Sequence, residues 1–194
     1  MKETTVLIAD DHAIVRMGLA ALLEPESGIR VIGEADDGDV AIRKAIRNRP
    51  DIVIMDIMMP VRDGISATQE IKSRLPHTRV LILTTSTVSD DLSRALEAGA
   101  DGAITKSNAT AQLLTAIRAI AAGKRWVSPE IEKQIATDPP VQKLTERQEV
   151  ILSSIVRGLT NADIAHQLGI REDSVKEHLN LIFSKIGAAN RAEA

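Results

Sequence analysis

The chain has 194 residues, 24 basic and 27 acidic side chains, a formal net charge of −3 at pH 7, and no cysteine. The lack of cysteine excludes thiol catalysis, disulfides and thiolate metal sites, and a single Phe, a single Trp and no Tyr argue against a nucleic-acid site built on stacked aromatic rings. A hydrophobic content of 44%, no apolar stretch long enough to span a bilayer and an acidic beginning predict a globular cytoplasmic protein with no membrane partner.

The first part of the chain alternates short apolar runs with helix-length stretches five times. Such runs are typical of buried parallel strands, and turn residues such as Gly38, Pro50 and Gly64 separate the units. The apolar runs are VLIAD, VIGEA, DIVIMD, RVLILTT and GAITK, and the helical stretches that follow them are 13–24, 40–47, 65–75, 92–98 and 111–122. The pattern predicts an α/β domain over residues 1–123, with a doubly wound five-stranded parallel sheet and helices on both faces.

The strand pattern stops at Gly123, and the next stretch, residues 124–142, is interrupted by prolines. Pro139-Pro140 is stiff, and we expect a linker with one short helix at most, over 129–135.

The last part of the chain, residues 143–194, has helical patterns and no strand pattern. Thr145 with Gln148, and Thr160 with Asp163, have the spacing of capping boxes at the starts of two helices. Gly169 then gives a tight turn into a third helix. The expected helices are 144–158, 160–168 and 172–186. Two helices joined by a short glycine turn predict a small all-α helix-turn-helix domain.

Charged and hydroxyl side chains lie at the carboxyl ends of several predicted strands. Asp10 and Asp11 follow the first apolar run, Asp56 ends the third, Thr84 lies at the end of the fourth and Lys106 ends the fifth. Parallel strands place their carboxyl ends at one edge of the sheet, where open α/β sheets have their sites. Three carboxylates suit Mg²⁺, which would allow Asp56 to accept a phosphoryl group, while Lys106 pairs with that group and Thr84 donates a hydrogen bond. A single aspartate would be an ordinary helix cap, but this combination predicts a phosphoryl-accepting site.

With these motifs, residues 1–123 resemble the receiver domain of a two-component response regulator, which has a flavodoxin-like fold. The resemblance rests on the strings IADDH, MDIMMP, LILTT and EAGADGAITK, in that order. It implies that Asp56 takes a phosphoryl group from a histidine kinase. It also implies that Asp11, Asp56 and the backbone carbonyl of Met58 hold Mg²⁺, with Asp10 supporting the ion through water.

One residue departs from the receiver pattern. Many receivers carry Tyr or Phe three residues before the lysine, whereas this chain has Ala103. That aromatic ring normally moves inward when the threonine hydroxyl approaches the phosphoryl group, and alanine has no rotamer to switch. We therefore expect normal phosphorylation of Asp56, with the signal carried by another route such as segment 86–90, or with weak coupling.

The last segment resembles the LuxR-type helix-turn-helix of the NarL/FixJ response regulators. The matching residues are Leu144, Thr145, Arg147, Gly158, Asn161, Ile164, Ala165, Leu168, Val175, Lys176, His178, Ile182, Lys185, Gly187 and Arg191. By this resemblance the third helix enters the major groove of promoter DNA. The predicted DNA contacts are Arg171, Lys176, Glu177, Asn180, Lys185 and Arg191. Of these, Lys185 and Arg191 are expected on phosphates, which position a protein without reading sequence.

The charge of this segment limits its expected affinity. Residues 141–194 carry seven basic and seven acidic side chains, whereas strong DNA binders are usually basic. We expect a monomer to bind weakly and a homodimer, formed on DNA or on phosphorylation, to bind usefully. Family members continue through most of another helix, so we expect the terminal helix here to be truncated.

The leading interpretation is a DNA-binding transcriptional response regulator, switched by phosphorylation of Asp56. It is not an enzyme, although a receiver can hydrolyse its own acyl phosphate. Two alternatives stay open: a regulator that works without phosphorylation, and a receiver whose helical domain binds protein. A metal-dependent phosphohydrolase that uses Asp56 is disfavoured because the sequence has no insertion long enough for a lid.

Overall fold

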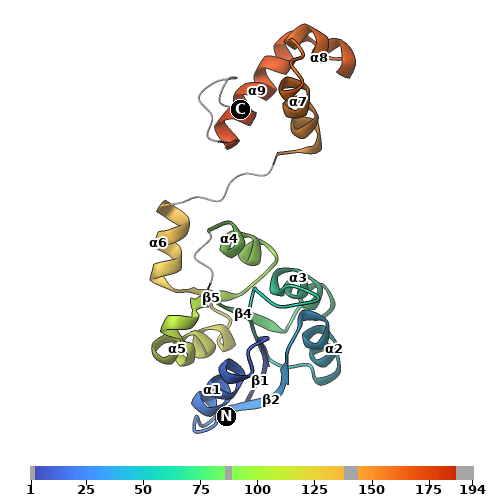
Figure 1. The fold of residues 1–194 in the computed structure, drawn as a ribbon. Coiled ribbons are helices and arrows are strands. Elements are labelled where there is room, and N and C mark those ends of the chain that lie inside the picture. The colour runs from blue at the N-terminus through green and yellow to red at the C-terminus, as the bar shows by residue number, and fades with distance from the viewer. Residues whose placement is uncertain (1–2, 86–88, 138–143, 187–194) are drawn as a thin grey trace. The chain divides into compact units, whose positions relative to one another are not determined.

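The computed structural model describes residues 3–85, 89–137 and 144–186, and divides the chain into two compact units (Figure 1). The first unit is Met1–Pro140 and the second is Val141–Ala194. Each unit is described here by itself.

The first unit contains a parallel sheet of six strands in the order β2-β1-β3-β4-β5-β6. The strands are β1 (Thr4–Ala9), β2 (Ile29–Ala35), β3 (Ile52–Met55), β4 (Arg79–Thr84), β5 (Gly102–Thr105) and β6 (Trp126–Val127). Every residue of β3 is buried, as expected of a central parallel strand that has both faces covered.

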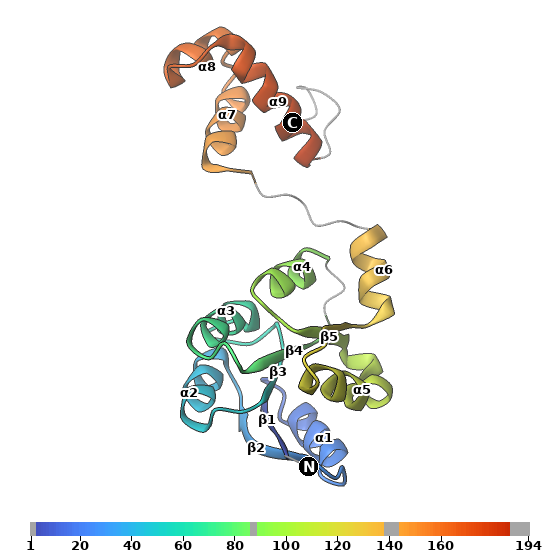
Figure 2. The same cartoon turned by 180° about the vertical axis from the view of Figure 1, so that it is seen from behind.

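Helices cover both faces of this sheet (Figures 1 and 2). They are α1 (Ala13–Leu23), α2 (Gly38–Asn48), α3 (Gly64–Arg74), α4 (Ser89–Glu97), α5 (Ala109–Ala121) and α6 (Pro129–Thr137), with a short 3₁₀ turn at Lys106–Asn108. Side chains such as Leu7, Val53 and Ile82 form one core with α2, α3, α4 and α6. Their neighbours along the strands, such as Ile8 and Ile54, form a second core with α1 and α5 on the opposite face. The predicted doubly wound α/β fold is thus confirmed.

Two predictions about the stretch after α5 are corrected. The sheet has six strands rather than five, because β6 pairs in parallel with β5. The short helix expected over 129–135 is present as α6. The first part of the stretch expected as a linker, however, belongs to the first unit, because β6 and α6 pack against β5 and α4. Residues 138–142 of that predicted linker lie outside the described residues.

The second unit is helical over its described residues, with α7 (Glu146–Val156), α8 (Asn161–Leu168) and α9 (Glu172–Ile186). Both predicted capping boxes are present, Thr145 with Gln148 and Thr160 with Asp163. Gly169 has φ 63°, the left-handed conformation that lets the chain turn from α8 into α9. The three helices close around a small core of Ile151, Ile155, Ile164, Ala165, Val175, Leu179 and Ile182. The helix-turn-helix expected from the sequence is therefore present.

A helix must be both long and apolar to cross a bilayer. Within residues 3–85, 89–137 and 144–186, no helix meets that requirement.

Candidate functional site

Two aspartates and a lysine from three strands meet at the carboxyl edge of the sheet. Asp10 follows β1, Asp56 follows β3 and Lys106 follows β5. The Lys106 Nζ atom lies 2.6 Å from Asp10 Oδ2 and 2.7 Å from Asp56 Oδ2. The two carboxylates are 1% and 3% exposed, so the lysine bridges a buried pair of like charges. The structure thus brings together the first, third and fifth strand ends as the sequence predicted.

Backbone hydrogen bonds fix the two carboxylates beside each other. The Asp56 N–H donates to the Ala9 carbonyl at 2.8 Å, and the Asp10 N–H donates to the Ala35 carbonyl at 3.1 Å. These bonds extend the pairing of β1 with its neighbours by one residue beyond the strands. The positions of both acids therefore follow from the register of the sheet.

A glycine shapes the loop that leaves Asp56. The Gly64 N–H donates to the Ile57 carbonyl at 2.8 Å, and a Cβ at Gly64 would overlap the carbonyl oxygen of Asp56. Any other residue at 64 would push the start of α3 away from the backbone of Asp56.

Burial and charge set the ionisation of this cluster. Burial raises the pKa of Asp56, as does the neighbouring Asp10 charge, against the lowering effect of the hydrogen bond and positive charge of Lys106. Burial alone would lower the pKa of Lys106, but its hydrogen bonds and ion pairs with Asp10 and Asp56 outweigh that effect and raise the pKa. Lys106 is therefore a fixed positive charge beside a carboxylate that the fold solvates poorly.

The same edge has the oxygen donors that a divalent cation requires. Asp10, Asp11, His12 and Asp56 each offer one ligand atom, and these atoms lie within 4.8 Å of one another. The buried Asp56 Oδ1 has no hydrogen-bond partner among the described residues. An unsatisfied buried carboxylate oxygen among other carboxylates fits Mg²⁺, which prefers hard oxygen ligands.

Two further residues, His12 and Met58, lie next to the acidic residues in the sequence. His12 is the N-cap residue of α1, and its Nδ1 lies 2.7 Å from Asp11 Oδ1. Its position directly after the acidic pair was the available signal. Met58 lies two residues after Asp56 with its side chain 61% exposed, and a metal-binding role for its carbonyl remains a prediction.

Thr84 and Ala103 are buried residues of the adjacent strands β4 and β5. Thr84 is fully buried at the end of β4 and pairs with Thr105 of β5. Ala103 is buried between two strands, opposite Ile82 of β4 and Val127 of β6. Position 103, where many receivers have an aromatic ring, is thus buried in a strand that has β4 on one side and β6 on the other.

The predicted DNA contacts in the second unit lie mainly on one side of α9. Lys176, Glu177 and Asn180 are exposed, whereas their neighbours Val175 and Leu179 are buried in the core. Arg171 is exposed just before the helix. The Lys176 ammonium lies 3.3 Å from Asp173 and 3.8 Å from Glu172, so acidic neighbours on its own helix reduce its net charge.

Two basic side chains stabilise the fold of the second unit: Lys185, which the sequence predicted as a DNA contact, and Arg147, for which it predicted no role. Lys185 Nζ donates to Gln148 Oε1 at 2.9 Å and so ties the end of α9 to the capping box of α7. Arg147 Nη2 donates to the Leu168 carbonyl at 3.0 Å, at the end of α8. The sixth predicted contact, Arg191, lies outside the described residues.

Comparisons with known proteins agree with both units. Residues 6–118 match the family described as the response regulator receiver domain, and residues 142–194 match bacterial regulatory proteins of the luxR family. The chain therefore belongs to the two-component response regulators that join a receiver to a LuxR-type DNA-binding domain.

Individual relatives cover almost the whole chain. The transcriptional regulatory protein LiaR of Bacillus subtilis (strain 168) is 37% identical over 97% of this chain and 93% of its own length. A LuxR-family response regulator structure from Aurantimonas sp. SI85-9A1 is 41% identical, with a TM-score of 0.67 over 70% of this chain and 97% of that one. A structure of two RcsB dimers bound to two parallel DNAs is 25% identical, with a TM-score of 0.70 over 99% of this chain and 96% of that one.

Proposed function

We propose that Asp56 accepts a phosphoryl group from a histidine kinase and that this modification controls binding of promoter DNA by the second unit. One observation carries the proposal: a lysine ammonium, 2.6 and 2.7 Å from two buried carboxylates, stands beside an Asp56 oxygen that lacks a hydrogen-bond partner among the described residues. Burying like charges in this way is unfavourable unless another charged group joins them. A phosphoryl group and a cation are such groups.

The chemistry requires little from the protein beyond position and charge. The Asp56 Oδ1 lone pair forms a bond to phosphorus as the phosphorus–nitrogen bond of a phosphohistidine breaks. The leaving imidazole keeps the electron pair of that bond and takes a proton from water. Lys106 stays protonated throughout and balances negative charge on the transferred group, since its pKa is raised. The buried Thr84 hydroxyl, at the end of the adjacent β4, is the group we assign to hydrogen-bond a phosphoryl oxygen.

Asp10, Asp11, Asp56 and the Met58 carbonyl are the groups we assign to Mg²⁺. When bound, the ion supplies positive charge that lets a carboxylate approach a phosphoryl group. The supporting observation is the oxygen-rich cluster whose ligand atoms lie within 4.8 Å.

For the second unit we propose that α9 lies in the major groove as the recognition helix. Lys176 and Asn180 then face base edges, Glu177 lies beside them, and Arg171 contacts a phosphate. Lys185 would have to release Gln148 to reach a phosphate, so we rank it below Arg171. The RcsB dimers on DNA support a dimer as the binding form, which fits the neutral charge balance of residues 141–194.

A second candidate, a helical output domain that binds protein, is favoured by one observation. Both acidic residues of the first turn of α9 lie within 4 Å of Lys176, so the best-placed cation on the helix is already paired. Failure of the purified chain to bind any promoter fragment would favour this candidate.

Incubation with a small-molecule phosphodonor and Mg²⁺ tests the first step. We expect intact-mass analysis to show one added phosphoryl group on the wild-type chain and none on Asp56→Asn. Asp36→Asn is the matched control, because Asp36 is exposed and follows β2 at the same edge of the sheet. Asp11→Asn should slow the reaction by about tenfold or more, since it removes a donor for the cation. Modification that persists in Asp56→Asn, or none in wild type, would contradict the assignment.

A further inference from the structure

The segment that leads out of the first unit is packed into its core. Ile131 of α6 is fully buried and belongs to the same core as Leu92 and Ala95 of α4 and Ala103 of β5. That core continues to Met55 and Ile57, the residues on either side of Asp56. Figures 1 and 2 show α6 beside α4 at the β5 edge of the sheet. The last described helix of this unit is therefore continuous, through packed side chains, with the neighbours of the phosphoacceptor.

Two small residues of β5 make this packing possible. A Cβ at Gly102 would overlap the Trp126 carbonyl, and Ala103 lies opposite Val127 and accepts a hydrogen bond from the Ser128 N–H at 3.0 Å. Ala103 and Ile131 are both buried in this core, so a larger side chain at 103 would require the core to rearrange. The small side chain of Ala103 thus has a structural role here, because it leaves room for β6 and α6 to pack against β5.

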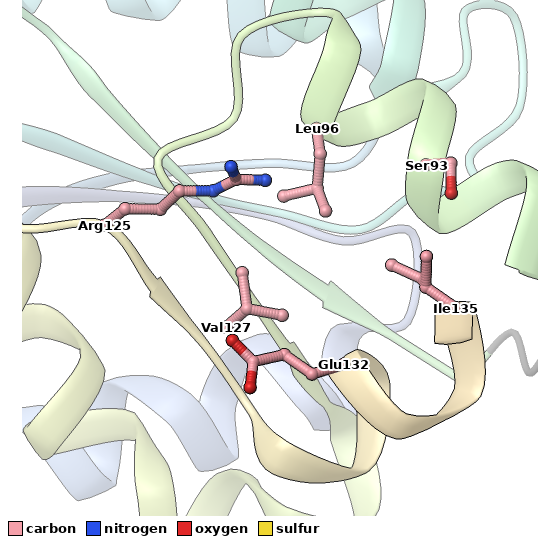
Figure 3. A pocket seen from close by; sticks show the side chains of 6 residues that line it. All are labelled: Ser93, Leu96, Arg125, Val127, Glu132 and Ile135. Atoms are coloured by element: carbon pink, nitrogen blue, oxygen red, sulfur yellow. The ribbon is translucent and has the colours of Figure 1, made fainter. Parts of the chain in front are cut away.

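The contact between α4 and α6 is incompletely filled. A hollow of about 570 Å³ separates Ser93 and Leu96 of α4 from Val127 and Ile135 on the other side, with Arg125 and Glu132 also lining it (Figure 3). The Ser93 hydroxyl is buried and makes no hydrogen bond to a described residue. Arg125 and Glu132 are exposed, so the hollow is open to solvent. The contact between α4 and α6, which we call the seam, therefore has room to close, and the unsatisfied Ser93 hydroxyl is unfavourable where it now lies.

Helix α4 is the element that connects the seam to the phosphoacceptor site. The buried Thr84 ends β4, and α4 begins at Ser89. If Thr84 hydrogen-bonds a phosphoryl group on Asp56, as proposed above, the end of β4 shifts toward Asp56 and α4, which follows β4 in the chain, shifts with it. Such a shift of α4 would close the hollow between α4 and α6, because packed elements move between discrete arrangements rather than deforming gradually.

We propose that phosphorylation of Asp56 closes the seam between α4 and α6, with Ile131 as the positioning residue that couples the two. The chain runs from α6, which ends at Thr137, to the second unit, which begins at Val141. Closure therefore restrains α6, the last described helix before the second unit. This inference rests on the proposed phosphorylation of Asp56.

Hydrogen–deuterium exchange of the full chain, with and without Mg²⁺ and beryllofluoride, tests the inference. Fluorine NMR of the same samples measures beryllofluoride bound at Asp56, and Asp56→Asn defines the unbound signal. We expect exchange of the α6 amides to slow by about threefold or more on beryllofluoride binding. The single Trp, Trp126 on β6, gives a second readout through its fluorescence.

Three variants separate coupling from stability. Ile131→Ala should bind beryllofluoride yet lose the change in α6. Ile117→Ala is its matched control, because Ile117 is an equally buried isoleucine in the core on the opposite face of the sheet; it should keep the change. Ser93→Leu, which fills the hollow, should slow α6 exchange even without beryllofluoride.

Each result is decisive. Beryllofluoride binding with unchanged or faster α6 exchange overturns the seam inference and leaves the phosphoacceptor assignment intact. No beryllofluoride signal in the wild-type chain overturns both. Loss of the α6 response in Ile117→Ala as well as in Ile131→Ala would assign the effect to general destabilisation and also overturn the inference.

Discussion

At the scale of single residues, the fold holds Asp56 in an environment that disfavours its charge. Burial, with the Asp10 charge, raises its pKa despite the opposing effect of Lys106. For an acid whose pKa is raised on folding, the favourable contribution is present below the unfolded-state pKa and is lost as pH rises through the folded-state pKa. Ionised Asp56 therefore destabilises the first unit at neutral pH. Such destabilising ionisable groups are typical of reactive sites.

We predict that Asp56→Asn raises the free energy of unfolding at pH 7 by about 1 kcal/mol. The gain should shrink as pH falls toward 3.8, the ordinary value for aspartate, and Mg²⁺ should reduce it by stabilising the wild-type carboxylate. Denaturant titrations across this pH range measure the difference. A less stable Asp56→Asn at pH 7 would contradict the account.

Asp101→Asn is the control of opposite sign for that experiment. Burial of Asp101 would raise its pKa, but hydrogen bonds from Lys72, the Val80 N–H and Arg79 outweigh burial and lower it. Its stabilising contribution is therefore present above pH 3.8 and is lost as pH falls through the lowered folded-state pKa. Asp101→Asn should destabilise the protein at pH 7 by about 2 kcal/mol.

At the scale of elements, β6 depends on a glycine in its neighbour. A Cβ at Gly102 would overlap the Trp126 carbonyl of β6, whereas a Cβ at Gly18 of α1 would meet no atom within 4 Å. We predict that Gly102→Ala destabilises the first unit by about 2 kcal/mol and red-shifts Trp126 fluorescence. Gly18→Ala, the same substitution in an open helical position, should stabilise it by about 0.5 kcal/mol.

Thermal unfolding followed by Trp126 fluorescence checks this pair of glycines. Equal stability of the two variants would show that β6 tolerates a side chain at 102. Such a result would also weaken the case that small residues on β5 exist to receive β6 and α6.

The sequence predicted most of these elements but not β6. Hydrophobic periodicity predicted five of the strands, and residue spacing predicted both capping boxes. The parallel arrangement of the strands predicted that Asp10, Asp56 and Lys106 meet. Periodicity did not predict β6, since Trp126–Val127 is two residues long and follows the turn at Gly123 in a proline-containing stretch. A strand of that length is defined by its partner rather than by its own composition.

Contacts between distant residues were likewise hidden from the sequence. The hydrogen bond from Lys185 to Gln148 joins residues 37 apart, and no spacing rule predicts it. Lysine on a helix next to a DNA-binding motif is read as a phosphate contact unless its partner is known. The same holds for Ile131, which a sequence pattern places in a linker and the structure places in a core.

At the scale of the whole molecule, the chain combines a site proposed to gain negative charge with a second unit that has no net charge. Residues 141–194 are neutral overall, and phosphate neutralisation supplies much of the affinity for DNA. A single copy should therefore bind weakly, and two copies held together should bind much more tightly because their half-sites act jointly. Control of DNA binding then depends on what phosphorylation of Asp56 does to the full chain.

The most direct test of the central claim is a titration of promoter DNA with the full chain at fixed salt, with and without beryllofluoride and Mg²⁺. We predict that the phosphoryl mimic tightens binding by about tenfold or more and that Asp56→Asn shows no change. Equal affinity in all four samples, or tightening that persists in Asp56→Asn, would contradict control of DNA binding through Asp56.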